Sequence, residues 1–212
     1  MVEHVYRRAV LSDVDAVVVA TDDQRIVDAV EAFGGIACLT RADHLTGTDR
    51  LAELTAQFPC DIVVNVQGDE PFIDPAAIDA LVEPLRRDQS EQMTTLCRAL
   101  LPDEDVRSPH LVKVVCDLRG RALYFSRAPI PFCRAQGGAA PMVHVGVYGY
   151  RRATLLALAA LPPSPLELSE SLEQLRALEH GISIRVVESP YESLSVDTLD
   201  DLERARRKVQ QP

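Results

Sequence analysis

The chain has 212 residues, the length of one large domain, and its 47% apolar and 25% charged residues are typical of a globular protein rather than a disordered or fibrous one. A formal net charge of −10 argues against a general nucleic-acid-binding protein, since such proteins usually carry a basic surface. The sequence shows neither the pattern of a signal peptide nor an apolar run of transmembrane length. The five cysteines are odd in number and lack metal-ligand spacing, which is typical of buried thiols in a reducing compartment. We therefore expect a soluble, cytoplasmic protein with no nucleic-acid or membrane partner.

The first third of the chain alternates between predicted helices and strands. Apolar spacing predicts helices over residues 1–11, 24–33 and 49–58, and buried strands over residues 15–20, 36–39 and 61–66. The order of elements after them is a helix at 75–87, a strand at 93–100, a hairpin of strands 112–116 and 122–126, a strand at 144–150, helices at 152–161 and 166–179, a strand at 182–187 and a helix from Thr198 to Arg207. This order predicts one α/β domain with a mixed, mostly parallel sheet and an inserted β-rich lobe at about 112–150.

The buried strand at 61–66 ends abruptly in Gln67-Gly68-Asp69-Glu70. In open α/β sheets, ligands bind just beyond the carboxyl ends of the strands, so these polar residues are candidates for a binding site. Asp69 offers the oxygen ligands that a hard cation such as Mg²⁺ prefers. A plain polar turn remains the alternative. Asp197, which enters the last helix, is either a capping residue or a second carboxylate for the same cation.

A polar loop between a strand and a helix, residues 40–50, contains Arg41 and Thr46 and suits an anionic or polar ligand at a helix N-terminus, or simply caps that helix. The inserted lobe carries further polar residues. Arg127 follows a strand and could grip a carboxylate in a bidentate fork. His144 and Tyr148 share one face of an alternating strand, and a structural histidine is the alternative. Glu173 and Gln174 are expected in the middle of a helix, where a solvated face is the default. The residues thus favour a Mg²⁺-assisted enzyme that acts on a phosphorylated small molecule.

Seven stretches, taken together, resemble the 3-deoxy-manno-octulosonate cytidylyltransferases. They are ATDDQRIVDAVEAFGG, TRADHLTGTDRLAE, DIVVNVQGDEPFI, VKVVCDLRGRALYFSRAPIPF, HVGVYGYRRATL, PSPLELSESLEQLRALEHG and SVDTLDDLERAR, and they cover almost the whole chain. The resemblance implies a three-layer nucleotidyltransferase fold with a mixed sheet. It also implies that CTP and the sugar acid Kdo are coupled to CMP-Kdo and pyrophosphate for lipopolysaccharide synthesis, by a homodimer that needs Mg²⁺.

The resemblance also implies roles for particular residues. Asp69 and Asp197 match the family's Mg²⁺ ligands, and they are the residues expected to be catalytic. The nucleotide would be held by Arg41, Thr46, Gln67 and Asp69. The sugar acid would be held by Gln67, Arg127, His144, Tyr148, Glu173 and Gln174, with Arg127 on its carboxylate. No general base is assigned, because a bound metal ion can lower the pKa of the attacking hydroxyl without one.

One departure concerns the family's first strand and basic phosphate loop, which have no counterpart in the chain. That strand would lie between the strands at 15–20 and 61–66, so the chain is expected to be incomplete and its own activity open. Smaller departures are Thr46, where serine is commoner, and a short loop at 133–143. Two alternatives stay open: a cytidylyltransferase for another sugar acid such as sialic acid, and a homologue that binds ligand without turnover.

Overall fold

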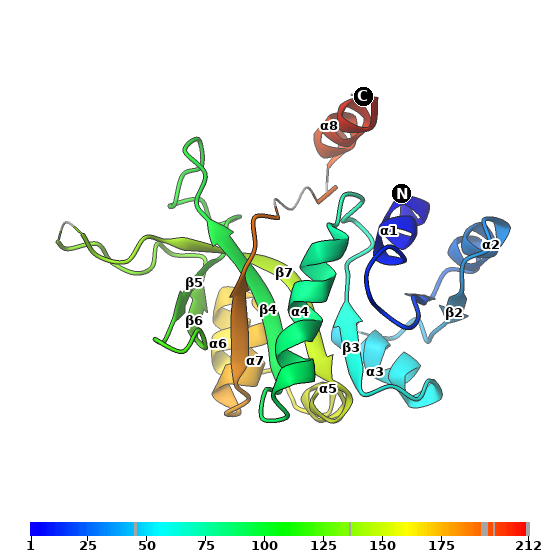
Figure 1. Ribbon diagram of the computed structural model, residues 1–212, viewed down its shortest axis with the longest axis horizontal. Coiled ribbons are helices and arrows are strands. Elements are labelled where there is room, and N and C mark those ends of the chain that lie inside the picture. Colours follow the sequence, from blue (N-terminus) through cyan, green and yellow to red (C-terminus); the bar gives the residue numbers. More distant parts are fainter. Residues whose placement is uncertain (45, 136, 192–194, 197, 211–212) are drawn as a thin grey trace. The chain divides into compact units, whose positions relative to one another are not determined.

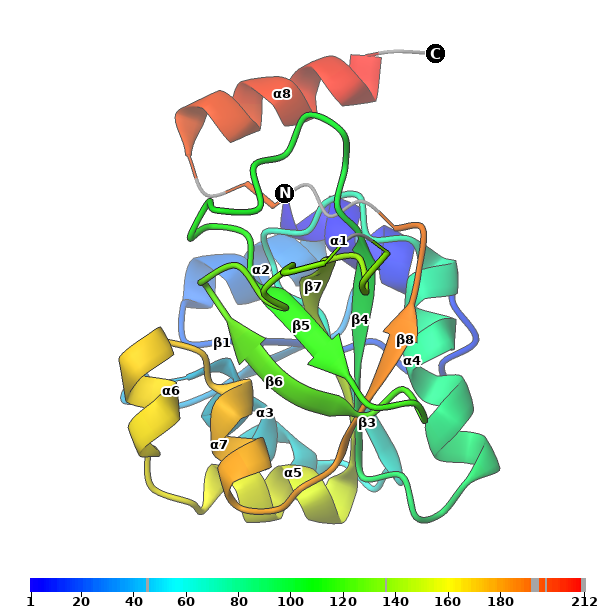
Figure 2. The ribbon, with the colours of Figure 1, turned by 90° about the vertical axis from the view of Figure 1, so that its left-hand side faces the viewer.

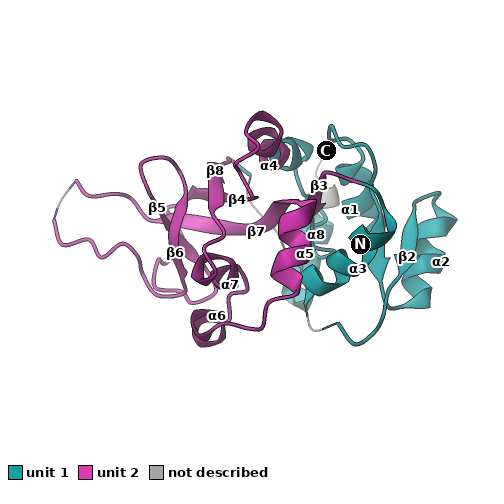
Figure 3. Ribbon diagram, turned by 90° about the horizontal axis from the view of Figure 1, so that it is seen from below, with its two compact units in different colours: residues 1–59, 65–79, 191–212 teal, residues 60–64, 80–190 magenta. Residues whose placement is uncertain are grey.

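The computed structural model describes residues 1–44, 46–135, 137–191, 195–196 and 198–210 (Figure 1). They belong to two compact units, which Figure 3 colours separately. Unit 1 comprises residues 1–59, 65–79 and 191–212, and unit 2 comprises residues 60–64 and 80–190. Within the described ranges, no helix is long and apolar enough to cross a membrane.

Unit 1 contains a two-stranded parallel sheet, β1 with β2, and the helices around it. Its elements are α1 (Val2–Ala9), β1 (Val19–Thr21), α2 (Gln24–Ala32), β2 (Ala37–Leu39), α3 (Gly47–Gln57) and α8 (Leu199–Gln210). Helix α2 begins at Gln24 because the Asp23 side chain accepts a hydrogen bond from the Arg25 amide, and it packs on both strands. The strand predicted at 15–20 is wrong in its extent. Only Val19–Thr21 forms a strand, because the partner strand β2 offers three residues to pair with.

Unit 2 contains most of a six-stranded sheet, in which the order β6-β5-β7-β4-β8 is joined by β3 on β7. Its strands are β3 (Ile62–Asn65, the last residue of which belongs to unit 1), β4 (Met93–Ala99), β5 (Lys113–Cys116), β6 (Ala122–Ser126), β7 (Met142–Arg151) and β8 (Ile184–Glu188). Its helices are α4 (Pro75–Arg87, which begins in unit 1), α5 (Arg152–Ala159), α6 (Pro165–Glu170) and α7 (Gln174–Glu179). Figure 2 shows the hairpin of β5 and β6, with α7 against β6.

The sheet of unit 2 is mixed, as predicted, but it is not mostly parallel. Strand β4 runs parallel to β8 and antiparallel to β7, while β5 runs antiparallel to both β6 and β7. The reason is that a hairpin and its returning strand β7 are inserted between β4 and β8 in the sequence, and hairpin neighbours are antiparallel. Helix α4 packs closely on this sheet at Gly149, where an added Cβ would lie 2.4 Å from Thr94 Oγ1 and 3.2 Å from the Leu81 carbonyl oxygen.

A bulge interrupts the pairing of β4 with β7. Thr95 is paired with Tyr148, whereas the next residue, Leu96, is paired with Val145, so β7 contains two extra residues at this point. Side chains alternate between faces along a strand, and one extra residue would therefore reverse the faces. Two extra residues preserve them, so His144 and Tyr148 stay on one face of the sheet, with their ring centroids 5.5 Å apart.

The single helix predicted at 166–179 is wrong, because the structure has two short helices there, α6 and α7. Ser171 ends α6 in the left-handed conformation, with φ of 53°. A right-handed helix cannot continue through a residue in that conformation. Glu173 and Gln174 consequently lie at the start of α7, and the prediction that they are in mid-helix is also wrong. The two helices are joined by a buried ion pair, in which Arg176 donates to Glu167 at 2.6 and 2.7 Å.

Candidate active site

The polar loop before α3 is held by capping. Thr46 precedes the helix, and its hydroxyl oxygen accepts a hydrogen bond from the Asp49 amide at 3.2 Å. Arg50 ties the loop back to the sheet, since its Nη1 donates to Thr40 Oγ1 at 2.5 Å and its Nη2 is 3.1 Å from Asp22 Oδ2. The hydroxyl of Thr46 thus caps the helix and still has a proton to donate to a ligand.

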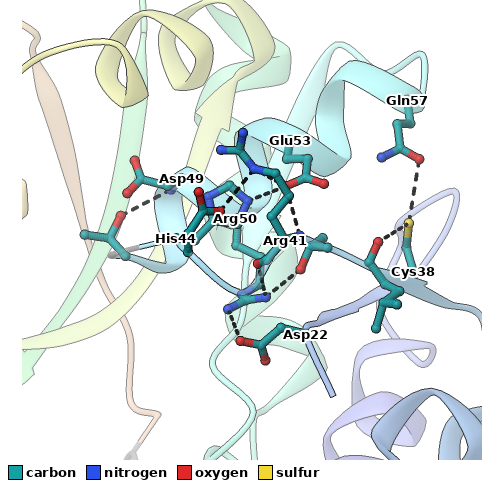
Figure 4. Close-up of polar contacts among 12 residues, drawn as sticks. Asp22, Cys38, Arg41, His44, Asp49, Arg50, Glu53 and Gln57 are labelled. Atoms are coloured by element: carbon teal, nitrogen blue, oxygen red, sulfur yellow. Dashed lines mark hydrogen bonds and ion pairs between the residues drawn. The ribbon is translucent and has the colours of Figure 1, made fainter. Parts of the chain in front are cut away.

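Arg41 lies beside two carboxylates (Figure 4). Its Nε is 3.2 Å from Asp43 Oδ1 and 3.7 Å from Glu53 Oε2, and its side chain is 69% exposed. Glu53 also accepts from the buried ring of His44 and from the Arg41 amide, and the His44 hydrogen bond is the main reason that the pKa of Glu53 lies below its usual value. Glu53 therefore stays ionised and orients Arg41, whose exposed guanidinium remains available to an anion.

Gln67 and Asn65 lie next to the start of α3. A Cβ added to Gly47 would be 3.8 Å from Asn65 Nδ2 and 3.9 Å from Gln67 Nε2. Asn65 is buried at the end of β3, whereas Gln67 is exposed. The structure thus brings Thr46 and Gln67, two residues predicted to bind the nucleotide, to one place in unit 1.

Asp69 lies in a loop that is held by hydrogen bonds from the segment after residue 190. The Val196 amide donates to the Asp69 carbonyl oxygen at 3.0 Å, and the Tyr191 hydroxyl donates to Glu70 Oε2 at 2.8 Å. Asp197 itself lies outside the described residues. The hypothesis that Asp69 and Asp197 hold one cation stays a prediction.

A magnesium ion fits this donor set, because Mg²⁺ is usually bound by one or two carboxylates together with substrate phosphates. Among the described residues, no group of three or more His, Cys, Asp or Glu side chains could hold a metal ion by itself. The magnesium site stays a prediction.

In unit 2, three of the predicted sugar-binding residues come together. His144 and Tyr148 are neighbours on β7, with ring centroids 5.5 Å apart, and the charge of Glu173 acts on Tyr148. Burial first, and then Tyr150 and Glu173, raise the pKa of Tyr148 well above its usual value. Burial likewise lowers the pKa of His144 to about 3. Both rings are therefore neutral near pH 7, so they offer hydrogen bonds and not charge.

Gln174 has a buried donor that needs a partner. The residue is 5% exposed, and its Nε2 has no hydrogen-bond partner among the described residues. A buried polar group without a partner costs free energy, and such groups are rare in native proteins unless a ligand or water satisfies them. The Gln174 amide is therefore available to a ligand or to a water molecule.

The guanidinium of Arg127 makes three hydrogen bonds to carbonyl oxygens of the protein. Its Nε donates to the Glu170 carbonyl oxygen at 2.8 Å, Nη1 to the Pro109 carbonyl at 2.8 Å and Nη2 to the Ser171 carbonyl at 3.2 Å. A guanidinium has five N–H donors, so one remains on each terminal nitrogen. These two still suit a carboxylate, and the three structural bonds fix their direction.

A second cation supports the same region from inside. The side chain of Lys113 is fully buried, and its Nζ donates to the carbonyl oxygens of Ser108 at 3.0 Å, Leu111 at 2.5 Å and Arg127. Burial lowers the pKa of Lys113 from its usual value. The ammonium thus joins the 108–111 loop to Arg127, which follows the last residue of β6.

Several residues that contact the predicted site residues were not themselves predicted from the sequence. Glu53 in unit 1, and Glu170 and Thr95 in unit 2, contact predicted site residues through the fold alone. Glu53 lies one helical turn after Asp49, a spacing typical of any exposed helix, so its pairing with His44 needed the structure.

Comparisons with known proteins place the chain in a family. The family model described as Cytidylyltransferase matches residues 1–184. The chain belongs to the cytidylyltransferase family. This chain is 52% identical over 220 residues to the 3-deoxy-manno-octulosonate cytidylyltransferase of Pelobacter propionicus. The match covers 98% of this chain and 86% of that one. The chain is 54% identical over 214 residues to the enzyme of the same name from Syntrophotalea carbinolica, covering 96% of this chain and 86% of that one.

Solved structures confirm the predicted fold of the cytidylyltransferase. A structure of CMP:2-keto-3-deoxy-manno-octonic acid synthetase complexed with CTP superposes with a TM-score of 0.94 at 45% identity, covering 98% of this chain and 86% of that one. A 4-diphosphocytidyl-2C-methyl-D-erythritol synthase from Anaerococcus prevotii, at 14% identity, gives a TM-score of 0.63 and shares the fold alone, covering 99% of this chain and 89% of that one. The nucleotidyltransferase-like α/β class predicted from the sequence is therefore confirmed.

Proposed function

We propose that the cytidylyltransferase couples CTP and Kdo to CMP-Kdo and pyrophosphate. The anomeric hydroxyl oxygen of Kdo forms a bond to the α-phosphorus of CTP, the bond from that phosphorus to the β-phosphate oxygen breaks, and the hydroxyl proton leaves to solvent. The similarity to enzymes of that name, at 52% identity over 98% of the chain, is the observation that carries the proposal. Transfers of this kind depend mainly on positioning and on neutralising charge.

Unit 1 supplies the nucleotide side of this reaction. Arg41, oriented by Glu53, would contact an anionic group, and the Thr46 hydroxyl and the Gln67 amide, which lie near each other, would contact the cytidine. Asp69 and Asp197 would hold Mg²⁺. The ion, when bound, neutralises the charge of the triphosphate.

Unit 2 supplies the sugar side. Arg127 would bind the carboxylate of Kdo with its two remaining N–H groups. His144, Tyr148, Glu173 and Gln174 would bind its hydroxyl groups. The unpartnered Nε2 of Gln174 supports this assignment, because a sugar oxygen would satisfy it.

We further propose that the enzyme works in the cytoplasm as a homodimer and supplies CMP-Kdo for lipopolysaccharide synthesis. All five cysteines are free thiols, which suits a reducing compartment. Leu118, Leu123 and Phe132 of unit 2 are exposed by 108%, 62% and 87%, and a second copy would cover such apolar side chains.

The test is pyrophosphate release from CTP by the purified chain, with Kdo or sialic acid as acceptor and with Mg²⁺ or a chelator. We expect release with Kdo and Mg²⁺ only. Release with sialic acid in preference to Kdo would overturn the choice of sugar. Tight binding of CTP and Kdo without any release would favour the non-catalytic homologue.

A further inference from the structure

The hydroxyl of Thr95 lies where three polar groups meet. Thr95 is fully buried on β4, and its Oγ1 is 2.9 Å from His144 Nε2, 2.9 Å from the Val147 carbonyl oxygen and 3.3 Å from the Val145 carbonyl oxygen. The bulge in β7 produces this arrangement. Val147 has no paired residue on β4 there, so its carbonyl oxygen turns to the Thr95 hydroxyl.

These contacts decide which nitrogen of His144 carries the proton. A carbonyl oxygen only accepts hydrogen bonds, and a hydroxyl has one proton to donate. If the hydroxyl donated to Nε2, its oxygen would face both carbonyl oxygens with no hydrogen between them, which is repulsive. The hydroxyl therefore donates to a carbonyl, and its oxygen accepts from an Nε2–H of His144.

The other ring nitrogen, Nδ1, is then an acceptor. It has no hydrogen-bond partner among the described residues, and it is not one of the side-chain atoms that are sealed from solvent without a partner. A sugar hydroxyl can donate to this nitrogen, but a carboxylate, which only accepts, cannot. Phe125, whose ring meets that of His144 edge-on at 4.9 Å, limits the rotation of the imidazole.

We propose that Thr95 is a positioning residue that fixes His144 as the Nε2–H tautomer, so that Nδ1 accepts a hydrogen bond from a hydroxyl group of the sugar acid. The sugar assignment rests on the proposed function, whereas the tautomer does not. The low pKa of His144, about 3, agrees with a ring that stays neutral. Thr95 thereby favours sugar substrates that place a hydroxyl group, and not a carboxylate, next to Nδ1 of His144.

The experiment is nitrogen-15 NMR of the histidine rings in the full chain, with the His144 signals identified by their absence from a His144→Gln variant. We expect a protonated Nε2, protected from exchange with water, and an unprotonated Nδ1 whose signal moves when Kdo is added. In Thr95→Val the protected Nε2–H signal should be lost, and Thr95→Ser should restore it.

The kinetic measurement uses a matched control. Thr95→Val should raise KM for Kdo about fivefold, the effect of one neutral hydrogen bond, and leave KM for CTP unchanged. Thr94→Val removes an equally buried hydroxyl, which donates to the Leu81 carbonyl at 2.8 Å, and should change stability without changing the His144 signals or KM for Kdo.

A protonated Nδ1 in the wild-type chain, or a protected Nε2–H that survives in Thr95→Val, would overturn the proposal. If the wild-type chain releases no pyrophosphate with Kdo, the proposed function fails, yet the NMR signals still decide the tautomer.

Discussion

Asp69 is fixed in place by neighbours that hold its main chain and the next side chain. The Val196 amide binds its carbonyl oxygen, and Tyr191 binds the buried carboxylate of Glu70. A main chain held in this way needs little reordering when the Asp69 side chain binds a cation, which favours tight binding.

We predict that Asp69→Asn lowers kcat/KM for CMP-Kdo formation by about a hundredfold or more, because a neutral amide would hold Mg²⁺, which neutralises the phosphates, more weakly than a carboxylate does. Pyrophosphate release at several Mg²⁺ concentrations measures the effect. Asp103→Asn, which removes an exposed loop carboxylate from unit 2, should leave the rate unchanged. Equal rates for Asp69→Asn and the wild-type chain would refute a role for Asp69 in metal binding.

At this scale, the sequence predicted which residues to inspect but not their hydrogen bonds. The fork geometry expected of Arg127 is restricted by three carbonyl oxygens from segments far away in the chain, and nothing near Arg127 in the sequence encodes them. The proximity of His144 and Tyr148 followed from strand alternation, since the bulge between them inserts an even number of residues.

At the scale of elements, α6 and α7 depend on one buried ion pair. Glu167 caps α6 by accepting from the Ser164 amide at 3.0 Å, and it pairs with Arg176 of α7. Burial acts to raise the pKa of Glu167, but the hydrogen bonds from Arg176 and Ser164 outweigh it, and the pKa is lowered. The pair therefore holds together two helices that Ser171 separates.

We predict that Glu167→Gln lowers the free energy of unfolding by about 3 kcal/mol at pH 7, because it leaves the Arg176 charge buried without a counter-charge. The folded-state pKa of Glu167 is lowered, so its stabilisation is complete above the unfolded-state pKa and is lost as pH falls through the folded-state value. The difference between variant and wild type should thus shrink in acid. Urea titrations between pH 3 and pH 7 measure it.

The control for this prediction is Glu179→Gln. Glu179 is exposed and accepts a hydrogen bond from the Leu166 amide at the start of α6, so its loss should cost far less. A stability difference for Glu167→Gln that stays constant down to the lowest pH would contradict the ion-pair explanation.

Element positions were predicted best where periodicity was long and clear. The helix at 75–87 and the hairpin at 112–126 agree closely with α4, β5 and β6. The strand at 15–20 was overestimated, because a strand extends only as far as its partner, and the partner is distant in sequence. The break at Ser171 was missed, because serine gives no sign of a left-handed conformation that glycine or asparagine would usually mark.

At the scale of the whole molecule, β1 pairs only with β2, and β3 only with β7, among the strands that the structure describes. β1 and β3 therefore each have one side without a paired strand among the described residues. Three exposed apolar side chains of unit 2, Leu118, Leu123 and Phe132, are a second feature at this scale, and they lie on the β5–β6 hairpin and the loop after it.

We predict that the wild-type chain sediments as a dimer and that Phe132→Ser raises its dissociation constant by about tenfold or more, as expected for an aromatic contact at an interface. Analytical ultracentrifugation over a concentration series measures both. Leu11→Ser, which changes a side chain of unit 1 that is 69% exposed, should leave the dimer intact. A monomeric wild-type chain would rule out the homodimer.

Lys113 has a consequence for how metal dependence is measured. Its ammonium is surrounded by three carbonyl oxygens, as a bound monovalent metal ion could be. Unlike such an ion, it is covalently attached to the chain. Such a tethered cation cannot be diluted, exchanged or removed by a chelator. The junction between the 108–111 loop and Arg127 should therefore survive chelation, so that activity lost on adding EDTA and regained with Mg²⁺ reports on the carboxylates of unit 1 alone.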